Sequence, residues 1–204
     1  MRARCHVVLF ARAPRLGRVK RRLARDIGVV AAWRFYRFTL ARQARTLARD
    51  RRWRLVLALD APLRGRSRWI RGVPVMAQPS GDLGARMAAA LDALPPGAAV
   101  LVGSDLPDLR PRHVAAAFVA LHRADMVLGP ASDGGYWLIG RRHAVRPLPR
   151  LEGVRWSTRH ALADTRAALA RRGTVGLAPT LADVDTGAAW HAWRRRSIPG
   201  TLAP

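Results

Sequence analysis

Residues 6–11 of the chain read His-Val-Val-Leu-Phe-Ala, and residues 12–23 read Arg-Ala-Pro-Arg-Leu-Gly-Arg-Val-Lys-Arg-Arg-Leu. The first stretch is short and apolar, which predicts a buried strand. The second mixes proline, glycine and basic residues, which predicts a loop. A long amphipathic helix should follow, with these residues along its buried face: Val29, Trp33, Tyr36, Leu40 and Leu47. A strand followed by a loop and a helix is the unit from which parallel sheets are built.

The same alternation continues to the end of the chain. Further strands are predicted at residues 54–59, 73–77, 99–103, 126–129, 136–140 and 174–177. Helices are predicted at residues 83–94, from Pro111 to about 123, from a cap at Ser157 or Thr158 to 172, and around 188–195. This pattern indicates an α/β fold with a mainly parallel sheet flanked by helices. No internal repeat and no long linker divides the chain, so we expect a single domain over residues 1–204.

The composition excludes several classes of protein. Half of the 204 residues are apolar, which argues against disorder. No apolar run approaches the roughly 20 residues that cross a bilayer, so we expect no membrane span. Cys5 is the single cysteine, which excludes a disulfide framework and a cysteine-built metal site. We therefore expect a cytoplasmic protein.

The formal net charge of +24 comes almost entirely from arginine. Lys20 is the only lysine among 37 basic residues, and Glu152 is the only glutamate among 13 acidic ones. This skew is typical of a coding bias, and spread charge raises affinity for polyanions without defining a site. The sequence has no basic tail and no RNA-binding signature, so we expect no specific nucleic-acid partner. A basic nucleic-acid-binding module stays an alternative. Where arginine is favoured throughout, a sole lysine marks a position that arginine does not suit.

Ligands of open α/β sheets bind outside the carboxyl ends of the strands, and the unusual residues of this chain fall there. After the first strand, a loop carries Gly17, Arg18, Lys20 and Arg22. A glycine at this place exposes backbone N–H groups, and the basic side chains add the positive charge that suits a diphosphate. A basic surface loop in a basic protein is the alternative.

Two acidic segments predict a divalent-cation site. Residues 103–108 read Gly-Ser-Asp-Leu-Pro-Asp, which places Asp105 directly after a buried strand. Residues 181–186 read Leu-Ala-Asp-Val-Asp-Thr, so that Asp183 and Asp185 point the same way if the segment is extended. Together with Asp105 they can share Mg²⁺ or Mn²⁺ that bridges two phosphates. Capping aspartates in a turn and surface acids before a helix are the alternatives.

Residues 78–84, Gln-Pro-Ser-Gly-Asp-Leu-Gly, form another glycine-containing loop. Gly81, Asp82 and Gly84 are candidates for a backbone-lined pocket that holds a base or a ribose. The alternative is that Asp82 caps the helix that follows.

Residues 129–137, Gly-Pro-Ala-Ser-Asp-Gly-Gly-Tyr-Trp, are the most unusual stretch. A hairpin turn at Asp133 and Gly134 explains part of it. Gly135 and Tyr136 in addition suggest a backbone edge and an aromatic platform for a sugar or another acceptor.

In this order the motifs resemble the nucleotide-diphospho-sugar transferase superfamily. They lie at residues 10–14, 17–20, 81–84, 103–108, 129–136, 156–158 and 183–186. The chain looks in particular like the bacterial branch described as arsenosugar-biosynthesis or radical-SAM/selenodomain-associated glycosyltransferases. The resemblance runs from about residue 7 to 186. A more distant similarity is to the phospholactate guanylyltransferases and the molybdenum-cofactor nucleotidyltransferases.

The resemblance implies a GT-A-type, Rossmann-like domain that binds a nucleotide sugar with Mg²⁺ or Mn²⁺. It implies Asp105 as the leading metal ligand and Asp185 as a second one. The phosphates would contact Gly17, Arg18, Lys20 and Arg22, and the nucleoside would contact Gly81, Asp82 and Gly84. The transferred group or the acceptor would contact Asp133, Gly134, Gly135 and Tyr136. Of these, Asp133 as a base and Lys20 as the partner of the leaving group would be catalytic.

The chain departs from the family pattern at Arg21, where threonine is usual, and at Ala85, where glutamate is usual. Because the central aspartates are present, we expect an intact site. The predicted activity is metal-dependent glycosyl transfer to a small-molecule acceptor. The alternative is nucleotidyl transfer from an NTP to a small phosphorylated acceptor, with release of pyrophosphate. The sequence does not separate the two, because both reactions use the same basic loop and aspartates.

Overall fold

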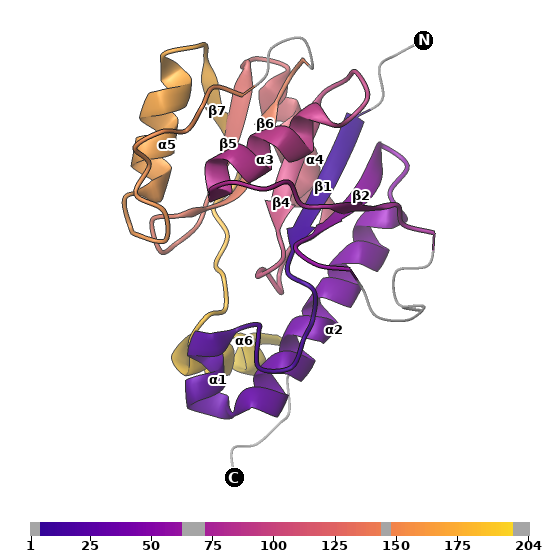
Figure 1. The fold of residues 1–204 in the computed structure, drawn as a ribbon, viewed down its shortest axis with the longest axis vertical. Coiled ribbons are helices and arrows are strands. Elements are labelled where there is room, and N and C mark those ends of the chain that lie inside the picture. The colour runs from indigo at the N-terminus through magenta and orange to yellow at the C-terminus, as the bar shows by residue number, and fades with distance from the viewer. Residues whose placement is uncertain (1–4, 63–71, 144–147, 198–204) are drawn as a thin grey trace.

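The computed structural model describes residues 5–62, 72–143 and 148–197, which form a seven-stranded sheet and six helices (Figure 1). The strands are β1 (Cys5–Ala11), β2 (Trp53–Leu59), β3 (Val75–Ala77), β4 (Ala99–Gly103), β5 (Met126–Pro130), β6 (Tyr136–Arg141) and β7 (Val175–Leu177). The helices are α1 (Arg21–Ile27), α2 (Val29–Ala48), α3 (Leu83–Asp92), α4 (Pro111–Leu121), α5 (Ala161–Ala170) and α6 (Gly187–Ser197).

The strand order in the sheet is β3-β2-β1-β4-β6-β5-β7. All neighbouring pairs are parallel except those of β6, which runs antiparallel to both β4 and β5. The strand β6 returns directly from β5, so the two form a hairpin. The predicted α/β class with a mainly parallel, mixed sheet is thereby confirmed.

Each face of the sheet carries its own core. In β1, Val7 and Leu9 pack on one side with apolar residues of α2 and α4, while Val8 packs on the other with residues of α3 and α5. All three side chains are fully buried. The alternation along a strand that has helices over both faces explains why the sequence of β1 is continuously apolar.

A small helical lobe lies beyond the carboxyl edge of the sheet. It consists of α1, the first half of α2 and α6, and Figure 1 shows it below the strands. Leu23, Phe35 and Trp193 form its core, and Val184 from the segment before α6 packs into the same cluster. The lobe therefore fixes the position of residues 183–186 relative to α1.

The predicted long helix corresponds to α2, but the loop predicted over residues 12–23 is wrong at its end, because α1 begins there at Arg21. The two helices are separated by a break at Gly28, whose φ is 85°. The break leaves Val29 in the first turn of α2 with 46% of its surface exposed, and not on the buried face. A glycine adopts a positive φ at little cost, so Gly28 is the local cause of the break.

The predicted cap of the fifth helix is also wrong. That helix begins at Ala161 after His160, without a side-chain cap. The Thr158 hydroxyl accepts a hydrogen bond from the backbone N–H of His160 and donates to the carbonyl of Arg155, so it stabilises a turn before the helix. Over the described residues, no helix combines the length and the apolar character needed to cross a membrane.

Candidate functional site

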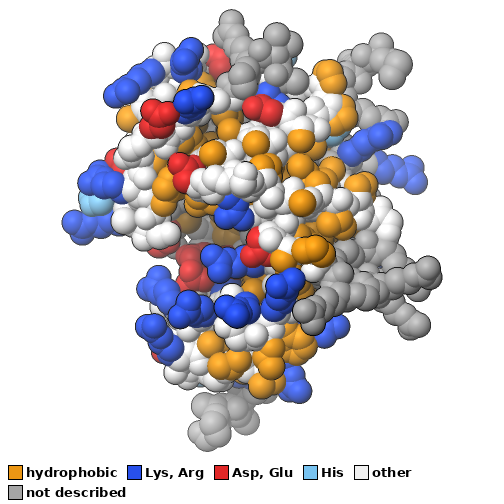
Figure 2. All heavy atoms as spheres, in the orientation of Figure 1, with side chains coloured by type: hydrophobic (Ala, Val, Ile, Leu, Met, Phe, Trp, Pro, Cys, Tyr) orange, Lys and Arg blue, Asp and Glu red, His pale blue; other side chains and the backbone are white. Residues whose placement is uncertain are grey.

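The largest concentration of predicted site residues lines a pocket of about 590 Å³ at the carboxyl edge of the sheet. The strand order reverses between β1 and β4, and Phe10 pairs with Gly103 in that register. The loops that leave these two strands are therefore side by side at the point where open α/β sheets bind ligands. Figure 2 shows a hollow between the sheet and the helical lobe, with carboxylates at one side and basic side chains along its lower rim.

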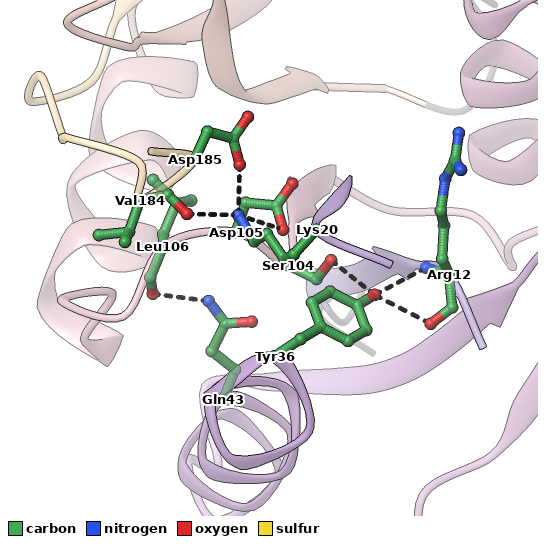
Figure 3. Close-up of polar contacts among 9 residues, drawn as sticks. All are labelled: Arg12, Lys20, Tyr36, Gln43, Ser104, Asp105, Leu106, Val184 and Asp185. Atoms are coloured by element: carbon green, nitrogen blue, oxygen red, sulfur yellow. Dashed lines mark hydrogen bonds and ion pairs between the residues drawn. The ribbon is translucent and has the colours of Figure 1, made fainter. Parts of the chain in front are cut away.

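Tyr36 of α2 connects the two loops. Its hydroxyl accepts a hydrogen bond from the backbone N–H of Arg12 at 2.9 Å and donates to the carbonyl of Arg12 at 2.9 Å. The hydroxyl is also 3.2 Å from that of Ser104 (Figure 3). Burial, and secondarily the charge of Asp105, raises the pKa of Tyr36 well above its usual range, so the phenol stays protonated. Tyr36 therefore holds the two loops together at the wall of the pocket.

The Lys20 side chain lies at the centre of the acidic residues. Its Nζ is 2.9 Å from Oδ1 of Asp105 and 2.5 Å from Oδ1 of Asp185. It also donates to the carbonyl of Val184 at 2.7 Å, and Figure 3 shows the ammonium between the two carboxylates. Residues far apart in the sequence, at 20, 105 and 185, thus form one cluster, as the sequence predicted for the two aspartates.

The position of Lys20 is set by the backbone as well as by these contacts. Lys20 precedes α1 in the left-handed conformation, with φ 50° and ψ 45°, which residues other than glycine adopt rarely. Only 3% of its side chain is exposed, against 47% for Asp105 and 37% for Asp185. Burial alone would lower the pKa of Lys20, but the two carboxylates outweigh it and raise the pKa, so the ammonium stays charged.

Two more aspartates add negative charge near this cluster. Asp183 has a raised pKa because it is partly buried and because the carboxylates of Asp185 and Asp133 repel its charge. The side chain of Val184 is buried in the helical lobe, and the alternation of an extended segment turns the flanking Asp183 and Asp185 away from that core. Lys20 is therefore the cation at the middle of an acidic region.

Basic and aromatic side chains complete the pocket. Arg18, Arg21 and Arg22 line it from the loop before α1 and from α1 itself. Arg86 of α3 lies 5.5 Å from the ring centroid of Phe10 and donates a hydrogen bond to the Gln78 side chain. The Gln78 amide in turn donates to the carbonyls of Ala11 and Ala58, which fixes its orientation.

Sequence analysis did not single out Gln78, Arg86 or Arg12 as site residues, although all three line the pocket. Gln78 follows β3 at the same edge as the other site loops, and this position was an available signal. Arg86 carried no signal, because one arginine in an arginine-rich chain does not stand out. Only the packing of α3 against the face of the sheet brings it to the pocket.

The hairpin between β5 and β6 brings part of the predicted acceptor site to the pocket. Asp133, Gly135 and Tyr136 line it, and the Asp133 carboxylate accepts a hydrogen bond from the backbone N–H of Gly135 at 2.9 Å. Gly134 does not line the pocket. Its φ is 86°, and a Cβ there would lie 2.3 Å from the carbonyl oxygen of Arg159, so this position requires glycine for packing.

The remaining predicted residues lie outside the pocket lining. Gly17 is in a turn with φ 72° before Arg18. Asp82 is the N-cap of α3, and its carboxylate accepts a hydrogen bond from the backbone N–H of Ala85 at 2.7 Å. This is the helix-capping role that the sequence analysis gave as the alternative. Gly81 precedes this cap with φ 108°, and Gly84 packs closely against Trp156. A nucleoside-binding role of these residues stays a prediction.

The carboxylates at the pocket suit a cation that is bound together with a substrate. Within the described ranges, no three His, Cys, Asp or Glu side chains are arranged to hold a metal ion. However, Asp105 and Asp185 are both at the pocket, partly exposed and next to basic side chains. Mg²⁺ is typically held by one or two carboxylates plus substrate phosphates, and the donor set fits that mode.

Comparisons with known proteins place this fold in a class. Nucleotide- and sugar-transferring proteins share the Rossmann-like mixed sheet. A provisionally named nucleotide-diphospho-sugar transferase from Desulfovibrio desulfuricans G20 is 30% identical, with a TM-score of 0.84 over 97% of this chain and 89% of that one. CMP:2-keto-3-deoxy-manno-octonic acid synthetase complexed with CTP is 12% identical, with a TM-score of 0.58 over 95% and 98% of the two chains. A Mycobacterium tuberculosis H37Rv protein in complex with manganese is 17% identical, with a TM-score of 0.52 over 94% and 97%.

The chain belongs to the DUF2064 family, whose description is "uncharacterized protein conserved in bacteria". The family profile matches residues 41–158, which include the β4 loop with Asp105 and the β5–β6 hairpin with Asp133. No curated protein matches the chain significantly. The narrower resemblance to arsenosugar-related glycosyltransferases and the distant one to guanylyltransferases stay predictions.

Proposed function

We propose that this chain is a metal-dependent glycosyltransferase that takes a nucleotide-diphosphate sugar as donor and a small molecule as acceptor. The observation that carries this proposal is the contact of Lys20 with Asp105 and Asp185 inside a pocket at the switch point of the sheet. The name of the D. desulfuricans relative, which is 30% identical, supports the same class of reaction.

In this proposal the phosphates of the donor lie between the basic loop and the aspartates. Arg18 and Arg22 bind phosphate oxygens through forked guanidinium groups. Asp105 and Asp185 would hold Mg²⁺ or Mn²⁺. A divalent cation bound there would offset the phosphate charge and stabilise the charge that develops on the leaving nucleoside diphosphate.

The hairpin side of the pocket then receives the sugar and the acceptor. Asp133 lines this side, and its carboxylate can accept the proton of an attacking hydroxyl group. Tyr136 and Trp156, whose ring centroids are 6.4 Å apart, offer aromatic surface to a sugar ring. Gly135 keeps a side chain out of the same wall.

Nucleotidyl transfer from an NTP is the second candidate, and one observation favours it. Arg18, Arg21, Arg22 and Arg86 all line the pocket, and this amount of positive charge suits a triphosphate. The fold similarity to a synthetase complexed with CTP is consistent with this candidate. The two reactions differ in the product that leaves.

A thermal-shift panel of nucleotides and nucleotide sugars, with and without Mg²⁺ or Mn²⁺, tests the proposal. We expect a nucleotide sugar to raise the Tm only when the metal is present. A product assay separates the candidates, because glycosyl transfer releases a nucleoside diphosphate and nucleotidyl transfer releases pyrophosphate. Salt-sensitive binding of DNA or RNA that is indifferent to EDTA and to Asp105→Ala, with no nucleotide effect, would contradict both.

A further inference from the structure

The contacts of Lys20 leave its ammonium surrounded by protein oxygens. An ammonium group has three N–H donors and no acceptor. In this structure Nζ donates hydrogen bonds to the Val184 carbonyl at 2.7 Å and to Asp185 at 2.5 Å, and it forms an ion pair with Asp105 at 2.9 Å. Three oxygen partners match the three donors, so Lys20 cannot bind a phosphate oxygen without weakening or releasing one of these contacts.

The same contacts bear on the two carboxylates. Lys20 holds the position between Asp105 and Asp185 where a cation would be shared, and its positive charge balances part of their negative charge. A divalent ion that entered beside Lys20 would be repelled by it at short range. Because the ammonium is nearly fully buried, salt screens this repulsion less than it would screen two fully exposed charges.

Release of Lys20 toward a phosphate has the opposite effect. It leaves Asp105 and Asp185 without their shared cation, while Asp133 and Asp183 add further negative charge nearby. The carboxylates then need a new cation, and the phosphate supplies additional oxygen ligands for it. Each ligand therefore removes an obstacle to the binding of the other.

We propose that Lys20 is a resident counter-ion that exchanges with the metal, so that the divalent cation binds only together with the phosphates of the donor. On phosphate binding the Lys20 ammonium moves from the carboxylates to the phosphate, and the cation takes its place between Asp105 and Asp185. This inference rests on the proposed function and adds an order to it, with metal and phosphate binding positively coupled. The lysine ammonium is a compact charge on a flexible stem, whereas the arginine guanidinium is a rigid planar fork. An ammonium therefore suits a group that moves between two carboxylates and a phosphate, which agrees with the single lysine in an arginine-rich sequence.

The sole lysine makes the exchange directly observable in the wild-type protein. Labelling with ¹⁵N-lysine gives one side-chain ammonium resonance, that of Lys20. We expect the resonance to stay unchanged with Mg²⁺ alone and to move when Mg²⁺ and inorganic pyrophosphate are added together. A resonance that does not move while pyrophosphate binds would overturn the exchange.

Titration calorimetry with Mn²⁺ alone tests the same point with variants. We expect Lys20→Met to bind Mn²⁺ about tenfold or more tightly than the wild type, a coupling of the ordinary size. Arg22→Met is the matched control, since it removes a pocket-lining charge that has no recorded contact with either aspartate. Its Mn²⁺ affinity should stay within about threefold of the wild type, because only general electrostatics change. Lys20→Gln serves as a second variant if Lys20→Met does not fold.

The outcomes separate this inference from the proposed function. If wild type and Lys20→Met bind Mn²⁺ alone equally tightly, the exchange is wrong and the metal-dependent function stands. If Arg22→Met gains as much affinity as Lys20→Met, the effect is one of net charge and the exchange is likewise wrong. If neither protein binds Mn²⁺ with or without pyrophosphate, the proposed metal dependence fails, and the inference fails with it.

Discussion

Asp105 and Asp185, which line the pocket, are bound in a different way from Asp125 and Asp164, which do not. Asp125 accepts the backbone N–H and the hydroxyl of Thr174 as well as an Arg142 contact, and these bonds lower its pKa to about 2. Asp164 accepts three hydrogen bonds from Arg155, which likewise lower its pKa to about 2. Lys20, by contrast, contacts one oxygen each of Asp105 and Asp185.

The two pairs of aspartates also differ in the exposed fraction of their side chains. The side chains of Asp125 and Asp164 are 23% and 20% exposed, against 47% and 37% for Asp105 and Asp185. The carboxylates of Asp125 and Asp164 accept hydrogen bonds that connect neighbouring segments of the chain. The pocket carboxylates keep accessible surface although their partner is buried. For these four aspartates, the donors around each carboxylate distinguish the structural pair from the pair at the pocket. Exposure alone does not, since Asp92 and Asp108 outside the pocket lining are 41% and 45% exposed.

The largest expected effect comes from Asp105→Asn. If the pocket carboxylates hold a metal against the donor phosphates, the loss of one charge should lower turnover by about 10²- to 10³-fold, as for other groups that stabilise developing charge. The measurement is product release with the nucleotide substrate that the thermal-shift panel identifies. Asp164→Asn is the control, and it should leave turnover within about threefold because neither Asp164 nor its partner Arg155 lines the pocket. Equal losses in the two variants would remove the distinction between the two groups of aspartates.

Gly134→Ala tests whether the hairpin that carries Asp133 is held by backbone packing and not by charge. The new Cβ would meet the Arg159 carbonyl oxygen at 2.3 Å, at a φ of 86°. We expect a loss of about 3 kcal/mol in the free energy of unfolding, from strain and overpacking together. Gly153→Ala is the matched control, because Gly153 has φ 75° but no neighbour within 4 Å. It should cost about 1 kcal/mol. If both variants lose a similar free energy of unfolding in urea denaturation, the positive φ alone accounts for the effect and the contact with Arg159 does not contribute.

Tyr36→Phe tests the connection that Tyr36 makes between the two loops at the wall of the pocket. Without the hydroxyl, the backbone N–H of Arg12 and the hydroxyl of Ser104 lose a shared partner in a buried place. We expect a loss of about 1–2 kcal/mol in the free energy of unfolding. The nucleotide-induced rise in Tm should also shrink, since the two loops lose their connection. A variant of unchanged stability would show that the loops are held by other contacts.

Asp125→Asn has the smallest expected effect and tests the structural group. The folded-state pKa of Asp125, about 2, lies below the ordinary value of 3.8. The stabilisation is therefore fully present above the ordinary pKa and is lost as the pH falls through the folded-state pKa. We expect a slightly lower urea midpoint for the variant at pH 7, and a difference that closes as the pH approaches about 2. A difference that does not depend on pH would assign the effect to altered hydrogen-bond geometry and not to charge.

Much of the fold was predictable because it depends on local pattern. The buried strands β1 and β4 are continuous apolar runs, and their bounds agree with the predicted ones to within a residue. The helix α1 was not predicted, because the proline, glycine and basic residues of residues 12–23 indicated a loop. The packing of α1 against α6, with Leu23 in the shared core, appears only in the tertiary structure.

The candidate site divides along the same line. The sequence by itself determined the mainly parallel sheet and the loops that carry the polar residues, and it predicted Asp105 and Asp185 at one edge and Asp82 as a candidate helix cap, because strand ends, caps and an extended Asp-Val-Asp segment follow from local pattern. Only the tertiary structure decided that Lys20 lies between the carboxylates of Asp105 and Asp185, and that Arg86 faces the pocket. Such contacts join residues up to 165 positions apart, and their formation depends on how helices pack, which residue spacing does not encode.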